Sequence, residues 1–114
     1  MLKYASLLIA ITALLGCAKR PDAITPASIP MAAYTNLSCA ELKQAHATER
    51  ARLSGLSAAQ NSAATGDAVG VFLIGVPAAS LTGGDKEGDV AVSKGKIEAM
   101  SQAALAKRCI LPAA

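Results

Sequence analysis

The chain has 114 residues and a formal net charge of +3, and 53% of its residues are hydrophobic while only 3% are aromatic. A chain of this length forms at most one modest domain. One Phe, two Tyr and no Trp cannot build a surface that stacks nucleic-acid bases, so we expect no nucleic-acid partner. The 26 alanines bury little area but favour helices, so the composition predicts helices around a thin core.

The first 17 residues have the features of a targeting segment. Lys3 supplies a positive charge, and the apolar stretch from Ala5 to Leu15 is too short to span a bilayer comfortably. Small Gly16 then precedes Cys17. The sequence Leu14-Leu15-Gly16-Cys17 resembles the motif that ends the bacterial lipoprotein signal, Leu-x-Gly/Ala-Cys. The alternatives are an ordinary secretory signal with an incidental cysteine, and an uncleaved anchor.

The resemblance to lipoproteins implies a modification and a location. In that family the signal, here residues 1–16, is removed, and the cysteine, here Cys17, receives a diacylglyceryl group and a further acyl chain such as palmitate. Several acyl chains together make a stable membrane anchor. The implied location is the oxidising cell envelope. Ala18 stands where an Asp is associated with inner-membrane retention in enteric bacteria, which favours the outer membrane, facing the periplasm.

A proline-containing segment follows the proposed acylation site. Three of the five prolines lie within residues 18–37, which show no hydrophobic period. Together with Cys17, these residues predict a flexible, partly polyproline-like tether over residues 17–37. The alternative is an ordered arm in which Ile24, Ile29 and Tyr34 pack against the rest of the domain.

The first predicted helix covers about residues 39–65. Ser38 and Glu41 have the spacing of a capping box, in which each side chain bonds to the backbone N–H of the other residue. A long stretch of good helix formers follows, interrupted by Gly55. Leu42, Leu53 and Leu56 lie roughly on one face of this helix.

The second predicted helix begins near Asp85. Acidic residues at its start, and Lys107 and Arg108 at its end, suit the helix dipole. Apolar residues recur at helical spacing along it: Val90, Ile97, Met100 and Ala104. Residues 89–93 alternate in polarity, so a short strand is an alternative there.

The cysteines indicate how the two helices are arranged. If Cys17 carries lipid, Cys39 and Cys109 remain, and an antiparallel hairpin places them side by side. We therefore predict an all-α fold, a disulfide-closed helical hairpin over residues 38–109 with a tail at 110–114. Two separate thiols or an intermolecular bridge are the alternatives. The expected core is small and needs such a crosslink; it comprises Leu42, Leu53 and Leu56 against Val90, Val92, Ile97, Met100 and Leu105.

The turn of this hairpin, about residues 66–84, is unusually apolar, and we call it the apolar tip. No charged residue lies between Asp67 and Asp85. Three interpretations are open: the first helix continues to about Ile74 and the segment after Pro77 folds back to cover it, the tip packs against another copy or another envelope protein, or it enters a bilayer. The candidate interaction residues are Val69, Val71, Phe72, Leu73, Ile74, Val76 and Leu81.

The sequence contains no recognisable catalytic or metal-binding pattern. His46 is the only histidine and has no partners at metal-site spacing, so we expect a solvated helix residue. There is no Cys-x-x-Cys, P-loop or nucleophile elbow. We therefore expect no cofactor, no metal and no enzymatic activity. The sequence favours a lipid-anchored envelope protein with a structural or protein-interaction role, with an envelope protein or a second copy as partner. The alternative is a membrane-interacting or self-associating element that acts through the apolar tip.

Overall fold

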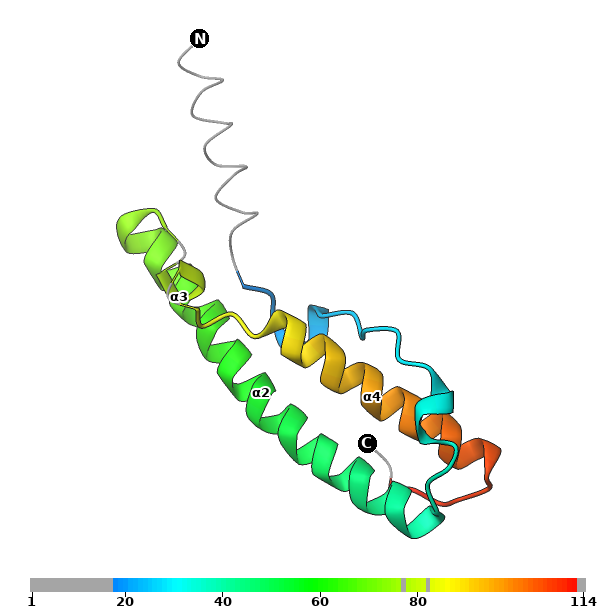
Figure 1. The fold of residues 1–114 in the computed structure, drawn as a ribbon. Coiled ribbons are helices and arrows are strands. Elements are labelled where there is room, and N and C mark those ends of the chain that lie inside the picture. The colour runs from blue at the N-terminus through cyan, green and yellow to red at the C-terminus, as the bar shows by residue number, and fades with distance from the viewer. Residues whose placement is uncertain (1–17, 77, 82, 113–114) are drawn as a thin grey trace.

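A computed structural model describes residues 18–76, 78–81 and 83–112. The elements, in chain order, are the short 3-10 helices η1 (Pro21–Ala23) and η2 (Met31–Tyr34), then α2 (Cys39–Ile74), α3 (Ala78–Leu81) and α4 (Glu87–Ala106). The two long helices run antiparallel, and the described residues extend over 63 × 24 × 20 Å (Figure 1). The predicted all-α hairpin is thus confirmed, and residues 89–93 lie inside α4 rather than in a strand.

The first long helix begins where the sequence predicts and ends later. The Ser38 Oγ accepts a hydrogen bond from the Glu41 backbone N–H at 3.1 Å, and Glu41 Oε2 accepts one from the Ser38 N–H at 3.0 Å. Helix α2 continues to Ile74 and stops at Gly75, whose φ of 78° is left-handed. The prediction of an end near residue 65 was wrong because tertiary contacts override the weak propensity of glycine and β-branched residues: α3 packs against this part of α2.

The core lies along an alanine-rich seam between α2 and α4. Leu42 and Met100 pack with Ala103 and Ala104, all of them buried. The expected core was wrong at two positions, because Val92 is 39% and Leu105 is 77% exposed. Small side chains let helix backbones approach closely, so the seam follows the alanines of α4 and leaves these larger residues outside it.

Residues 18–37 form an arm that packs along the hairpin, which is the alternative to the predicted flexible tether. The arm starts against α2 and then runs along α4 toward the start of α2 (Figure 1). Ile24 is 3% exposed, and the Ala27 N–H donates to the Ala91 carbonyl at 2.8 Å. The Lys94 ammonium donates to the Ile24 carbonyl at 2.8 Å. A tether was the wrong expectation for these residues because their backbone groups find partners on α4, which a hydrophobic pattern does not reveal.

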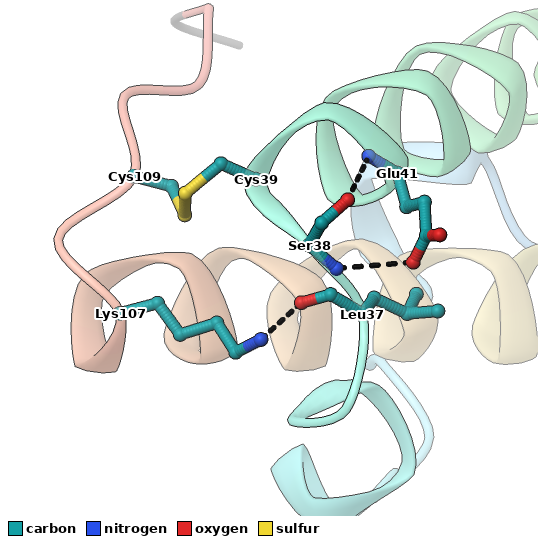
Figure 2. Close-up of a disulfide and its surroundings, with 6 residues drawn as sticks. All are labelled: Leu37, Ser38, Cys39, Glu41, Lys107 and Cys109. Carbon is teal, nitrogen blue, oxygen red and sulfur yellow. Dashed lines mark hydrogen bonds between the residues drawn. A yellow bond between two sulfur atoms is a disulfide. The ribbon is translucent and has the colours of Figure 1, made fainter.

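A disulfide closes the hairpin at the end far from the apolar tip (Figure 2). Cys39 and Cys109 are bonded, with their Cα atoms 5.5 Å apart, as predicted. Arg108 precedes Cys109 in a left-handed conformation, with a φ of 58°. In this turn the Cys109 N–H donates to the Ala104 carbonyl at 2.8 Å, and Lys107 donates to the Leu37 carbonyl. The turn after α4 therefore brings Cys109 back to the first residue of α2.

Candidate functional site

The last two turns of α2 carry a cluster of exposed large apolar residues. They extend past the start of α4 (Figure 1). Phe72 is 88% exposed, Leu73 and Ile74 are each 69% exposed, and Val69 is 50% exposed. Among the other predicted tip residues, Val76 is partly exposed and Val71 is half-buried, while the side chain of Leu81 lies outside the described ones.

The segment after residue 77 folds back, but it does not cover these side chains. Helix α3 packs lower on α2, where a Cβ added to Gly66 would lie 3.0 Å from the Ala79 Cβ. Ala18, Ala63 and Ala64 form a small buried cluster there with Ala79. The first of the three interpretations of the tip is therefore right about the helix and the reversal of the chain, and wrong about the cover.

Asp67 joins the start of the arm to α3, and it lies in α2 just before the exposed residues. Its carboxylate is fully buried and accepts hydrogen bonds from the Ala18 N–H at 2.6 Å and the Ser80 N–H at 2.7 Å. The Ser80 hydroxyl donates to it as well. The sequence showed Asp67 only as the boundary of an uncharged run, so its structural role was missed. A lone carboxylate beside an apolar run was the one available signal.

The pKa of Asp67 follows from two opposing effects. Burial by itself raises the pKa of the carboxyl group. The hydrogen bonds from the Ser80 side chain and from the backbone N–H groups of Ser80, Ala18 and Ala79 outweigh burial and lower the pKa below its ordinary value. Asp67 is therefore ionised at neutral pH, and its charge is satisfied inside the protein.

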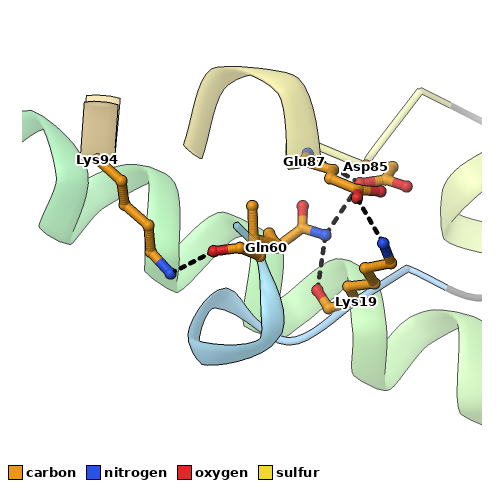
Figure 3. A network of polar contacts seen from close by, with 6 residues as sticks. Lys19, Gln60, Asp85, Glu87 and Lys94 are labelled. Atoms are coloured by element: carbon orange, nitrogen blue, oxygen red, sulfur yellow. Dashed lines mark hydrogen bonds and ion pairs between the residues drawn. The ribbon is translucent and has the colours of Figure 1, made fainter. Parts of the chain in front are cut away.

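Gln60, about two turns before Asp67 in α2, links the arm to the start of α4 (Figure 3). Its buried side-chain amide donates to the Lys19 carbonyl at 2.8 Å and to Asp85 Oδ1 at 2.9 Å, and accepts from the Lys86 N–H at 2.6 Å. Lys19 also pairs with Glu87 at 3.1 Å. Gln60 and Asp67 together fix the first residues of the arm against the tip end of the hairpin.

The other end of the molecule has a hollow beside the disulfide. It has a volume of about 290 Å³ and is lined by residues that include His46, Ile97 and Leu105. His46 is 3% exposed, so its expected solvation was wrong. Its Nδ1 has no hydrogen-bond partner among the described residues. Burial, and then the nearby Arg50 charge, lower the pKa of His46, so this imidazole is neutral at pH 7.

Within the described residues, no group of three or more His, Cys, Asp or Glu side chains could hold a metal ion. None of the helices in this part of the chain is both long enough and apolar enough to cross a membrane. The expected lipid attachment residue, Cys17, lies outside the described residues. Comparisons with protein-family models, curated proteins and solved structures found no match for this chain.

Proposed function

We propose that this chain is a lipid-anchored protein of the bacterial cell envelope, attached through acyl groups on Cys17. The observation that carries the proposal is the Leu14-Leu15-Gly16-Cys17 motif. The residue that follows this motif, Ala18, is already held on the domain, by its N–H on the Asp67 carboxylate. The outer membrane, with the domain in the periplasm, fits Ala18 better than the inner membrane does.

The disulfide supports a location outside the reducing cytoplasm. Cys39 and Cys109 are 70 residues apart in sequence and bonded in the fold. Structural disulfides persist in oxidising compartments such as the periplasm. An exported lipoprotein would form this bond after translocation.

We further propose a non-enzymatic role in structure or protein interaction. The fold is a narrow rod, suited to holding one end away from its anchor. Near the disulfide, the rod presents two exposed apolar side chains, Leu105 at 77% and Ile110 at 92%, next to the hollow described above. Exposed apolar groups of this kind suit contact with an envelope protein or a second copy.

The anchor is tested by analysing the mature protein from a bacterium that processes lipoproteins. We expect intact-mass measurement to show a chain that begins at residue 17 and carries acyl groups, and detergent partitioning to place it in the membrane fraction. The matched control, Cys17→Ala, should show no acyl group by the same mass measurement. A wild-type protein that keeps residues 1–16, or carries no acyl group, would refute the proposal.

A further inference from the structure

We infer that the exposed end of α2 enters the same bilayer leaflet as the acyl chains, so that the protein stands upright on the membrane at two contact points. This inference rests on the acylation of Cys17 proposed above. The inserted residues are Val69, Phe72, Leu73 and Ile74. The occupant of this apolar surface is thus the lipid hydrocarbon rather than a protein groove.

Proximity to the anchor is the first argument. Ala18, the residue after Cys17, is held by its N–H on the Asp67 carboxylate at 2.6 Å. Phe72 and Ile74 lie five and seven residues beyond Asp67, which is about 7.5 and 10.5 Å along the helix axis. Because neighbouring Cα atoms are about 3.8 Å apart, acyl chains on Cys17 must leave the protein close to the exposed apolar residues.

The shape of the apolar surface is the second argument. Phe72, Leu73 and Ile74 are consecutive, and successive helix residues point about 100° apart. Three exposed apolar neighbours therefore cover about 200° of the helix circumference. A helix that binds in a protein groove needs an apolar stripe on one face. An apolar surface on several sides fits a medium that surrounds the helix end, as lipid does.

The absence of charged side chains in the turn beyond Asp67 is the third argument. Residues 68–84 contain no charged side chain, and the carboxylate that precedes them, Asp67, is buried and hydrogen-bonded. At the helix end, the Gly75 N–H donates to the Val71 carbonyl at 3.0 Å. Charged groups and unsatisfied backbone groups oppose entry into hydrocarbon, and these contacts reduce both obstacles.

The expected depth agrees with a single leaflet. The hydrocarbon core of a bilayer is about 30 Å thick, so one leaflet contributes about 15 Å. An insertion of about 10 Å beyond the level of Asp67 stays within that leaflet. With Ala18 and α3 near the interface, the disulfide end points away from the membrane.

The test uses the acylated full-length protein and a fluorescent probe of depth. The chain has no Trp, so Phe72→Trp introduces the only one, at a position 88% exposed where the fold is not disturbed. Leu105→Trp is the matched control, because Leu105 is also a highly exposed apolar residue but lies near the disulfide. Both proteins are reconstituted in phosphatidylethanolamine and phosphatidylglycerol vesicles, with and without bromine on the acyl chains.

We expect the Phe72→Trp emission to shift to the blue and to be quenched by the brominated lipid, while Leu105→Trp shows neither effect. Acylated Phe72→Trp protein that floats with the vesicles but is not quenched would overturn the inference alone. Blue-shifted but unquenched Phe72→Trp emission would show that a second copy covers the tip. Quenching of both variants would show that the molecule lies flat on the membrane. Either result overturns the upright arrangement. Protein without acyl groups would overturn the proposed function, and the two-point contact with it.

Discussion

The contact between the arm and α4 predicts an unusual effect of a Gly95→Ala substitution. Alanine in a helix interior normally stabilises a protein by about 1 kcal/mol relative to glycine. A Cβ on Gly95, however, would lie 2.1 Å from the Ala27 carbonyl oxygen and 2.9 Å from the Ile29 side chain. Because a backbone oxygen cannot rotate away like the end of a side chain, the arm must lift from the helix.

The size of the effect follows from what the lifted arm loses. The bond from the Ala27 N–H to the Ala91 carbonyl contributes about 1 kcal/mol, and burial of Ile24, which is 3% exposed, contributes about 2 kcal/mol. After the gain in helix propensity, we expect the free energy of unfolding to fall by about 2 kcal/mol.

Urea unfolding followed by circular dichroism measures this change on a chain that starts at residue 18, which contains every residue that the structure describes. Gly55→Ala is the matched control, because a Cβ at Gly55 meets nothing within 4 Å, and it should stabilise by about 1 kcal/mol. If Gly95→Ala stabilises as much as Gly55→Ala, the arm does not lie on α4. Faster hydrogen exchange of the Ala27 amide in Gly95→Ala would locate the damage.

Four other substitutions have defined outcomes. Replacing Cys39 and Cys109 with Ser opens a crosslink between residues 70 apart and should lower the free energy of unfolding by about 4 kcal/mol on the chain-entropy estimate; an unchanged urea midpoint would refute this. The pKa of His46 is lowered in the fold, so the unfolded chain takes up this proton at a higher pH than the folded chain does. The free energy of unfolding should therefore be highest above about pH 6.5 and fall as the pH drops below that value. In His46→Gln, the urea midpoint should depend less on pH across this range. Arg108 has a φ of 58°, so Arg108→Gly should raise the thermal midpoint, by relief of about 1 kcal/mol of strain, and a lowered midpoint would contradict that reasoning. Asp67→Asn removes acceptors for buried donors and should lower the free energy of unfolding by about 1–3 kcal/mol. Because the pKa of Asp67 is lowered in the fold, the stabilisation by this carboxylate is present above about pH 4 and is lost as the pH falls through that lowered pKa. Identical acid-unfolding curves for the wild type and Asp67→Asn would count against this role.

Local signals in the sequence were sufficient for much of the fold. The capping box places the start of α2 because Ser38 and Glu41 bond to each other's backbone within one turn. The disulfide followed from the antiparallel order of two helices with a cysteine near one end of each. These features depend on neighbours in sequence or on one simple topological rule, so a pattern can reveal them.

Other features depend on groups far apart in sequence. The continuation of α2 past residue 65 accompanies contacts with α3 at Gly66 and Asp67, and the burial of Asp67 depends on donors 13 and 49 residues away. His46 looked solvated in a polar stretch, yet it is 3% exposed. No periodicity encodes these positions, because backbone donors and glycine or alanine contacts leave no hydrophobic pattern.

The sequence by itself determined the two long helices, their crosslink and the location of the apolar residues at 69–76. It also supplied the lipoprotein-like motif at Leu14-Leu15-Gly16-Cys17. Only the tertiary structure decided where Ala18, the residue after this motif, lies. A free tether would have left the anchor unrelated to the tip. The carboxylate of Asp67 and the amide of Gln60 instead bind the backbone of Ala18 and Lys19, because buried polar groups require partners, and this brings residue 18 to the apolar end of the rod.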